Sequence, residues 1–254
     1  MMNIFKYKNP YPLDTPESTL FHRDIILHKK FLNRLYTEWY ESLIRKAEHC
    51  GNGIFLEIGS GGGFLKNLFS KVVTSDILDL PLMDIVCSAE QLPFEDNSIA
   101  CIMMLNVFHH IPNPCLFLNE AQRCLIMGGK ILMIEPANSS WGRFIYKYFH
   151  HEPFDPNTGR EINPGNPVSN SNQALPYIYF ERDIKYFNEQ FKKLQLNEIL
   201  YHTPFLYLIS GGLSRKAFLP SLLYGVVKFF ERILSPFNKQ LGMFCTIEIE
   251  KNNL

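Results

Sequence analysis

The stretch FLEIGSGGGF, which runs from Phe55 to Phe64, decides the fold of this chain. It places an apolar strand directly before a turn with glycine at four of five consecutive positions. Glycine lets a backbone approach a ligand closely, and such turns after buried parallel strands form ligand sites. Glu57 lies inside the strand, two residues before the first glycine. A carboxylate at this point favours a ligand that carries positive charge, such as an amino group or a sulfonium.

The sequence around this turn alternates between short apolar runs and helical patterns. Helices are predicted at 64–70 and 115–126, the second one ended by Gly128 and Gly129. Strands are predicted at 54–58, 72–76, 83–87, 99–105 and 130–135. Continuous apolar strands that alternate with helices indicate an α/β fold, with a parallel sheet covered on both faces.

The two flanks of this alternating region differ from it in composition. Residues 1–18 are rich in proline and tyrosine, and apolar residues then recur at helical spacing from Thr19 to about Cys50. Beyond the fifth strand, the predicted elements are helices at 141–151 and 181–194, a long loop at 152–176, a strand at 197–201, an apolar helical insertion within 213–236, and a last strand at 243–251. Long loops of this kind are usually functional.

The composition excludes several classes of protein. The 254 residues include 25 acidic and 25 basic side chains, so the chain has no general electrostatic affinity for nucleic acid. Hydrophobic residues make up 46% of the sequence, which is enough for a large core. The six cysteines form no CxxC pair, and together with the absence of a signal pattern they favour a reducing, cytoplasmic location. No apolar run is long enough to predict a transmembrane helix.

The spacing of the glycine turn argues against a dinucleotide site. The dinucleotide fingerprint needs a third glycine where this chain has Phe64. Asp76 ends the second predicted strand, nineteen residues after Glu57. A carboxylate at that place can accept hydrogen bonds from both ribose hydroxyls, or it can serve as a surface cap. Together with the turn, the ribose role is favoured.

Five blocks of sequence occur in the order seen in one large family. They are LEIGSGGG (56–63), TSDI (74–77), AEQLPFEDNSI (89–99), LNVFHHIPNP (105–114) and EAQRCLIMGGKILMIEP (120–136). The chain resembles class I S-adenosylmethionine-dependent methyltransferases, in particular the small-molecule type that includes the ubiquinone/menaquinone-biosynthesis enzymes. The resemblance implies a Rossmann-like three-layer sandwich, with a seven-stranded, mostly parallel sheet whose last strand is antiparallel. It also implies S-adenosylmethionine as the cofactor.

The resemblance further implies a domain layout and a set of cofactor contacts. Residues 1–50 would cover the cofactor site, 51–136 would form the cofactor-binding core, and 137–254 would complete the same domain. Glu57 would hold the methionine amino group of the cofactor, and Asn106 would offer that group its backbone carbonyl. The full set implied is Glu57, Gly59, Ser60, Gly61, Gly63, Asp76, Ile77, Ser88, Ala89, Glu90 and Asn106.

Individual roles follow from the same resemblance. Asp76 would bind the ribose, Ile77 would pack on the adenine, and residues 88–90 would flank the adenine edge, while Gly63 would ease packing of the next helix on the strand. Two positions depart from the family pattern. Ser88 stands where an aspartate often contacts the adenine amino group, and it can accept only a weaker, neutral hydrogen bond. Ala100 replaces a frequent aspartate at the start of the fourth strand.

The candidate catalytic residues are His109 and His110, which follow the fourth predicted strand. If the methyl acceptor is a hydroxyl, one of these histidines can act as a general base, or the pair can simply pack and meet solvent. Substrate contacts are predicted for Glu135, which alternatively caps a turn, and for Arg143, His150 and His151. His150, His151, Glu152 and Asp155 could form a divalent-metal site together with His109 and His110. Their spacing matches no ligand motif, so substrate-lining or solvated roles are preferred and no metal is predicted.

The apolar insertion at 217–234 has three interpretations. It can be a helix buried against residues 141–149, which is favoured, it can form a wall of an apolar acceptor site, or it can contact a membrane surface that holds a lipid substrate. The predicted function is methyl transfer from S-adenosylmethionine to a small-molecule or lipid-like acceptor, with peripheral membrane contact as an option and no nucleic-acid partner. The alternatives are a cofactor-binding accessory protein without catalysis and, opposed by Glu57 and Phe64, a NAD-dependent oxidoreductase.

Overall fold

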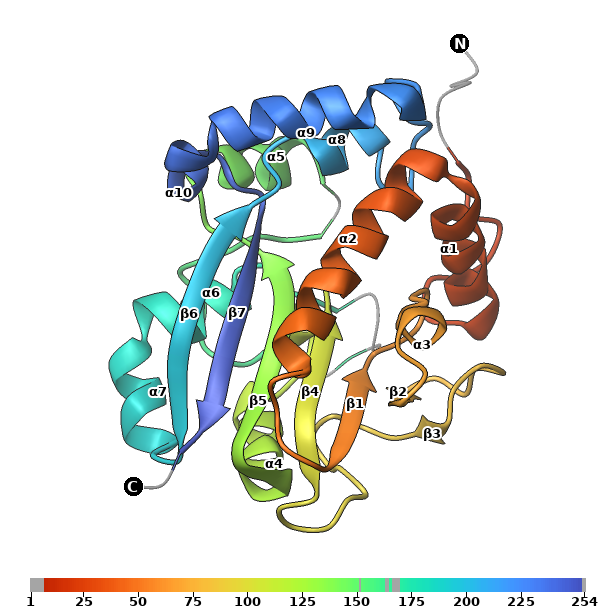
Figure 1. Ribbon diagram of the computed structural model, residues 1–254. Coiled ribbons are helices and arrows are strands. Elements are labelled where there is room, and N and C mark those ends of the chain that lie inside the picture. The colour runs from red at the N-terminus through yellow and green to blue at the C-terminus, as the bar shows by residue number, and fades with distance from the viewer. Residues whose placement is uncertain (1–6, 151, 163–164, 166–169, 253–254) are drawn as a thin grey trace.

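The computed structural model of the protein describes residues 7–150, 152–162, 165 and 170–252. Its centre is a seven-stranded sheet in the order β3-β2-β1-β4-β5-β7-β6 (Figure 1). The strands are β1 (Ile54–Ile58), β2 (Val72–Asp76), β3 (Ile85–Val86), β4 (Ile99–Leu105), β5 (Leu125–Pro136), β6 (Leu194–His202) and β7 (Phe244–Lys251). Neighbouring strands from β1 to β5 are parallel, and β7 is antiparallel to both of its neighbours. The predicted fold class is confirmed.

Helices cover both faces of this sheet. The helices are α1 (Pro16–His28), α2 (Lys30–Ala47), α3 (Leu65–Leu68), α4 (Pro114–Cys124), α5 (Ser140–Phe149), α6 (Leu175–Tyr177), α7 (Ile184–Gln190), α8 (Leu206–Ser210), α9 (Tyr224–Ile233) and α10 (Asn238–Leu241). Three short 3₁₀ turns lie at Phe108–His110 (η1), Ser221–Leu223 (η3) and Ser235–Phe237 (η4), and a π turn lies at Ile178–Arg182 (η2).

The alternation of side chains along β5 shows how two cores form. Ile131 and Met133 face a core shared with α4, α6 and α7, whereas Leu132 and Ile134 face a second core shared with α2, α5 and α8. Successive side chains of a strand point to opposite faces, so an unbroken apolar strand such as this one suits only a sheet buried on both sides. This arrangement explains why the central strands carry hydrophobic runs instead of an alternating pattern.

The single helix predicted from Thr19 to Cys50 is wrong in one respect, because it is broken at Lys29. The backbone of Lys29 leaves the helical region, with φ −87° and ψ 87°, and separates α1 from α2. Its buried side chain donates hydrogen bonds to the carbonyls of Gly212 and Arg215. The break is therefore held by contacts with a segment far away in the sequence.

The glycine pair predicted to end the helix after Cys115 has a different role. The helix α4 ends at Cys124, and β5 begins at the next residue, so Gly128 and Gly129 lie inside the strand. A Cβ atom added to Gly129 would meet the carbonyl oxygen of Ile126 at 2.9 Å. The pair thus permits an irregular start of β5, which its register with β4 also shows.

The helix within 217–234, predicted to be buried against residues 141–149, is largely exposed in the structure, where it forms α9. Of α9, only Tyr224, Val227 and Glu231 are buried, and Tyr224 packs on Phe31 of α2 at a ring-centroid distance of 4.9 Å. Its other apolar side chains are exposed. Within the described residues, every helix is too short or too polar to cross a bilayer.

Candidate functional site

A cavity of about 350 Å³ opens at the carboxyl ends of β1, β2 and β4. It is large enough for a small organic ligand. Its lining includes all but one of the residues predicted to contact a cofactor, namely Gly59, Ser60, Gly61, Gly63, Asp76, Ile77, Ser88, Ala89, Glu90 and Asn106. Glu57 is the exception, because it lies buried one strand position behind the lining residue Ile58.

The glycine turn brings its backbone close to neighbouring elements as well as to the cavity. Gly59 has φ +65°, and a Cβ atom at this position would meet a methyl carbon of Val107 at 2.5 Å. At Gly63 a Cβ atom would meet the hydroxyl of Tyr40 in α2 at 2.0 Å. The predicted role of Gly63 in packing the next helix on its strand therefore changes, since the close neighbour is α2.

Asp76 connects the glycine turn with the loop after β2. Its Oδ2 accepts a hydrogen bond from the backbone N–H of Gly61 at 2.9 Å, and its Oδ1 accepts one from Leu78 at 2.9 Å. Burial raises the pKa of the Asp76 carboxyl, while these backbone donors act in the opposite direction. Each carboxylate oxygen has two acceptor sites, so further lone pairs remain for a ligand in the cavity.

The charges around the cavity are negative. Asp76 and Glu90 contribute carboxylates, and no described residue of the lining is a lysine or an arginine. Glu90 is held in place by the backbone N–H of Asn113, which donates to its Oε1 at 2.6 Å. A phosphate ligand would find no lysine or arginine in the described lining, whereas a cationic ligand would be attracted to the two carboxylates.

Glu57 lies beneath the turn with almost no exposed surface. Its side chain is 2% exposed, and its Oε2 has no hydrogen-bond partner among the described residues. Burial raises the pKa of this carboxyl to about 7. A carboxyl with such a pKa responds to a cation brought near it, because the cation favours the ionised form.

The raised pKa of Glu57 predicts a pH effect on stability. The folded protein holds this proton up to about pH 7, whereas the unfolded chain loses it near the ordinary value of 4.5. Stability from this group is therefore fully present below pH 4.5 and is lost as the pH rises through 7, by about 3 kcal/mol in total. We expect Glu57→Gln to flatten the pH dependence of the free energy of unfolding, measured in urea without ligand between pH 5 and 8.

The control for this experiment is Glu41→Gln, which removes an exposed carboxylate from α2. This variant should keep the pH dependence of the unmodified protein. Parallel stability curves for Glu57→Gln and the unmodified protein over the whole pH range would contradict the assigned pKa.

His109 lies on η1, next to the cavity but not in its lining. Its Nδ1 donates to Oε2 of Glu135 at 2.6 Å, and its Nε2 lies 3.4 Å from Oε2 of Glu152. Burial alone would lower the pKa of His109, but the two carboxylates outweigh it and raise this pKa to about 9. His109 is therefore protonated at neutral pH and cannot accept a further proton.

Glu135 caps the turn after β4, and not the turn before Pro136 that was the predicted alternative to a substrate contact. It is fully buried, and its Oε1 accepts hydrogen bonds from the backbone N–H groups of Val107 and Phe108, both at 2.8 Å. The same side chain orients His109. Glu135 does not line the cavity, so it holds the turn after β4 and does not contact a ligand there.

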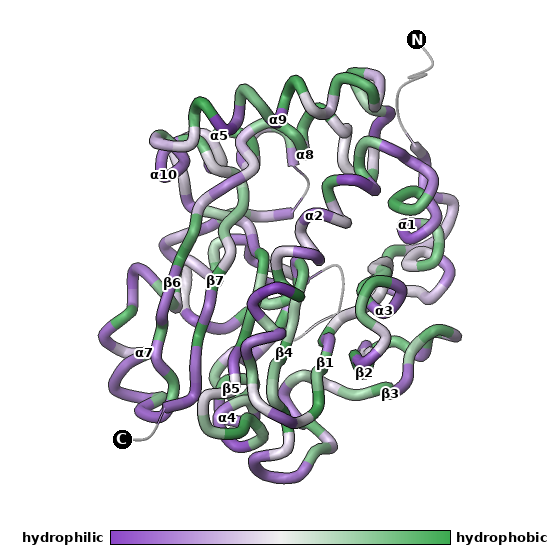
Figure 2. The backbone as a smooth tube through the Cα atoms, in the orientation of Figure 1, coloured by the Kyte–Doolittle hydropathy of each residue, from purple (hydrophilic) through white to green (hydrophobic). Residues whose placement is uncertain are grey.

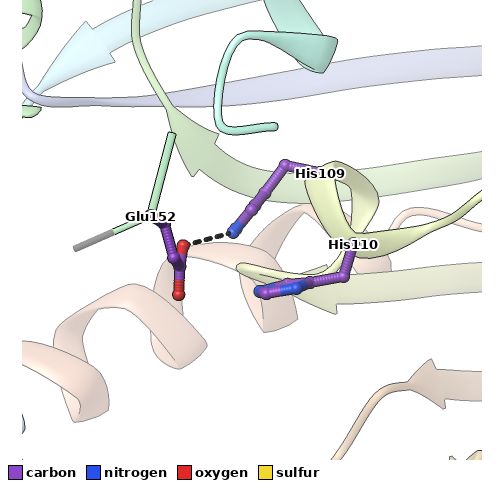
Figure 3. Close-up of side chains that lie close together, drawn as sticks. All are labelled: His109, His110 and Glu152. Atoms are coloured by element: carbon purple, nitrogen blue, oxygen red, sulfur yellow. Dashed lines mark ion pairs between the residues drawn. The ribbon is translucent and has the colours of Figure 1, made fainter. Parts of the chain in front are cut away.

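Of the two histidines on η1, His110 is the one that lines the cavity. The carbonyl oxygen of Asn170 lies 3.2 Å from its Nδ1 and accepts a hydrogen bond from it. Burial and the charge of His109 lower the pKa of His110 to about 4. Figure 3 shows the two imidazole rings together with Glu152, which extends toward them from the segment after α5.

The remaining residues predicted to contact the substrate lie in different places. His150 lies near Glu152, and the amide nitrogen of Gln173 is 2.6 Å from its Nδ1. Arg143 lies on the exposed face of α5 and does not reach the cavity. His151 lies outside the described residues.

Sequence reasoning missed the wall that α1 and α2 build around the cavity. Its members are Thr19, His22, Ile26, Tyr36 and Tyr40, and Leu213 joins them from the segment before α9. A leading helix was expected to cover the site, but its apolar spacing does not show which side chains turn toward the cavity. The aromatic residues at 36 and 40, one turn apart, were the available signal.

Comparison with known families identifies the central part of the chain. Residues 56–133 match a family described as a methyltransferase domain. This range runs from β1 to β5 and contains the glycine turn, Asp76 and both histidines of η1.

Two curated proteins show similarity over part of their length. The ubiquinone/menaquinone biosynthesis C-methyltransferase of Rickettsia felis is 28% identical over 175 residues, which cover 67% of this chain and 66% of that protein. An uncharacterized protein of Methanocaldococcus jannaschii is 29% identical over 124 residues, 45% of this chain and 54% of that protein. The chain thus spans just under two thirds of the first relative and about half of the second.

A solved structure from Thermotoga maritima has a similar fold. It is described as an S-adenosylmethionine-dependent methyltransferase, possibly a histamine N-methyltransferase. Its TM-score is 0.50 at 15% sequence identity, and the alignment covers 92% of this chain and 98% of that one. At this identity, the similarity supports the fold alone.

Proposed function

We propose that this chain, which contains a class I S-adenosylmethionine-dependent methyltransferase domain, transfers a methyl group from that cofactor to a small, lipid-like acceptor. The domain match and the sheet order confirm the predicted resemblance and the cofactor class. The identity of the acceptor and the role of each residue are the parts that we propose.

The charge of the cavity is the observation that carries the proposal. A glycine turn that ends in a cavity with two carboxylates and no described lysine or arginine suits a sulfonium and an ammonium group. The pyrophosphate of a dinucleotide would be repelled by the same surface. In this assignment Asp76 accepts hydrogen bonds from the ribose hydroxyls, and Ile77, which is 52% exposed, offers an apolar face to the adenine.

Methyl transfer asks for few chemical groups from the protein. The acceptor atom forms a bond to the methyl carbon while the carbon–sulfur bond breaks and its electron pair stays on sulfur, which gives S-adenosylhomocysteine. The protein must chiefly hold the two reactants in line. If a proton must leave the acceptor, His110 is the histidine with the right position and charge state, because it lines the cavity and is neutral.

The lipid-like character of the acceptor is inferred from the exposed side of α9. Leu222, Val226, Phe229, Phe230 and Ile233 are each at least half exposed, which is unusual for so many large apolar side chains. Figure 2 shows the hydrophobic character of this helix, and Figure 1 shows that it lies at the end of the molecule toward which β1, β4 and β5 point. The cavity opens at the same end of the sheet.

Basic residues accompany this apolar surface. Residues 204–243 contain five lysines and arginines, Arg215, Lys216, Lys228, Arg232 and Lys239, but only one acidic residue, the buried Glu231. The carboxylate of Glu231 is used internally, since it accepts hydrogen bonds from the backbone N–H groups of Phe205 and Leu206. An exposed apolar helix with basic flanks is typical of segments that lie on an anionic membrane surface.

We therefore expect the protein to bind phosphatidylglycerol-containing vesicles and to bind pure phosphatidylcholine vesicles less. The double variant Phe229→Ser/Phe230→Ser should weaken binding by about tenfold or more, because two aromatic side chains no longer enter the bilayer interface. Sedimentation with vesicles measures the effect. The matched control is Leu116→Ser, which removes an exposed apolar side chain of α4. Equal vesicle binding by all three proteins would contradict the membrane contact.

The test of the proposed reaction has two stages. Calorimetric titration with S-adenosylmethionine, S-adenosylhomocysteine and NAD should show binding of the first two only. Release of S-adenosylhomocysteine is then followed with candidate acceptors such as quinols and other isoprenoid or acyl phenols in vesicles. Binding of NAD alone would contradict the cofactor assignment, and cofactor binding without any turnover would favour an accessory protein.

A further inference from the structure

We infer that Nε2 of His109, Nε2 of His110 and the carboxylate of Glu152 form a binding site for one divalent transition-metal ion. One potential ligand atom from each of these residues lies within 4.8 Å of the other two (Figure 3). Metal–ligand bonds of about 2.0–2.2 Å would place these atoms roughly 3–4 Å apart, so the side chains must close by roughly 1 Å. No ligand motif marks this site in the sequence, because Glu152 comes from a segment beyond α5.

The hydrogen bonds of the two histidines leave the correct nitrogen for a metal ion. The carboxylate of Glu135 accepts the proton on Nδ1 of His109, and the backbone carbonyl of Asn170 accepts the proton on Nδ1 of His110. Nε2 of His110 therefore carries a free lone pair, whereas at Nε2 of His109 the ion would displace the proton that faces the carboxylate of Glu152. Histidines that bind metals are usually oriented through the other ring nitrogen in this way.

Glu152 is oriented by a partner of its own. The side-chain nitrogen of Gln173, a residue that is 2% exposed, donates to Oε2 of Glu152 at 2.9 Å. Oε2 also lies 3.4 Å from Nε2 of His109, so an ion bound at this place would stand between an imidazole and a carboxylate. Each of the three ligands is thus held by a second residue, which is the arrangement that metal sites require.

The ligand types indicate which ions the site would bind. Two imidazoles and one carboxylate favour Zn²⁺ or Fe²⁺ over Mg²⁺ and Ca²⁺, which prefer a shell made of oxygen atoms. Three protein ligands leave at least one coordination position open. His110 lines the cavity, so an oxygen or nitrogen of the methyl acceptor can occupy that position. With the ion bound, Nε2 of His110 is a metal ligand and no longer the general base of the proposed function. This use of the ion rests on the proposed function, whereas the ion site itself does not.

The experiment titrates Zn²⁺ and Co²⁺ into the chelator-treated full-length protein. We expect one equivalent to bind, with a Co²⁺ absorption spectrum that lacks a thiolate charge-transfer band, because the six cysteines are free and none belongs to the cluster. His110→Ala and Glu152→Gln should weaken binding by about tenfold or more. The control His49→Ala removes an exposed histidine from the turn after α2 and should bind like the unmodified protein.

Several outcomes would overturn the site. They are no metal binding by the unmodified protein, a thiolate band in the Co²⁺ spectrum, or a metal affinity of His110→Ala and Glu152→Gln that equals that of the unmodified protein. Gln173→Leu serves where a ligand variant fails to fold, since loss of an orienting residue costs about 10- to 100-fold in metal affinity. Titration of the same samples with S-adenosylmethionine separates the two proposals, because cofactor binding without metal binding contradicts only the ion site.

Discussion

Replacing Asp76 by alanine is expected to weaken the binding of S-adenosylmethionine about a hundredfold or more. In the proposed assignment this carboxylate accepts hydrogen bonds from two ribose hydroxyls, and each bond to a charged group contributes about 1.5–3 kcal/mol. The same side chain holds the backbone N–H groups of Gly61 and Leu78, so its loss also loosens the turn that borders the cavity. Calorimetric titration of the purified variant gives the change in Kd directly.

Two controls make this result specific. Asp79→Ala removes an exposed carboxylate from the same loop and should leave the affinity unchanged. The analogue of S-adenosylhomocysteine without the ribose 2′-hydroxyl cannot form one of the two hydrogen bonds to Asp76. The substitution Asp76→Ala should therefore weaken the binding of this analogue less than it weakens the binding of S-adenosylhomocysteine itself. If Asp76→Ala binds the cofactor as tightly as Asp79→Ala does, Asp76 only caps the turn.

Replacing Glu135 by alanine is expected to destabilise the fold by about 3–5 kcal/mol, the usual effect of removing one partner from a buried pair. Its carboxylate lies at the end of β5 and joins it to the turn after β4 through three hydrogen bonds. Without it, Nδ1 of His109 and the backbone N–H groups of Val107 and Phe108 lose their acceptor. Urea unfolding followed by circular dichroism measures the loss.

The comparison variants separate the carboxylate from the size of the side chain. Glu135→Gln keeps an acceptor for the two backbone N–H groups but loses the charge opposite His109, so its destabilisation should be smaller than that of Glu135→Ala. Glu95→Ala removes an exposed carboxylate and should have almost no effect. An unfolding free energy for Glu135→Ala within 1 kcal/mol or so of the Glu95→Ala value would contradict the central place given to this side chain.

The parts of the structure that the sequence predicted correctly depend on local signals. The turn at 59–63 follows the apolar strand β1 and Asp76 ends β2, and parallel strands bring their carboxyl ends to one edge of the sheet. Their meeting around one cavity therefore follows from strand order alone. Family resemblance supplied the order of the strands, which spacing could not.

The parts that could not be predicted depend on contacts between distant segments. Nothing around Lys29 marks a helix break, since neither glycine nor proline is present there, and the carbonyls that hold its side chain come almost two hundred residues later. Glu152 approaches His109 and His110 only because the segment after α5 returns across the end of the sheet. The spacing of residues within each segment does not predict this contact.

The apolar insertion shows a different limit. Apolar composition favours burial, and this predicts α9 as a core helix, but composition does not say whether the rest of the chain can reach it. In the structure only one side of α9 packs, with Tyr224 against Phe31 and the carboxylate of Glu38. The other apolar side chains of α9 are exposed on the surface of the protein.

The position of β7 between β5 and β6 determines when the fold can be completed during synthesis. Among the described strands, β6 pairs only with β7, which follows it in the sequence. A nascent chain that still lacks residues 244–251 therefore has β6 unattached and the edge of β5 open to other strands. A chain cut before residue 244 would thus lose the pairing of β6 and leave the edge of β5 open, and it would be prone to aggregate although it contains the glycine turn and the cavity-lining residues.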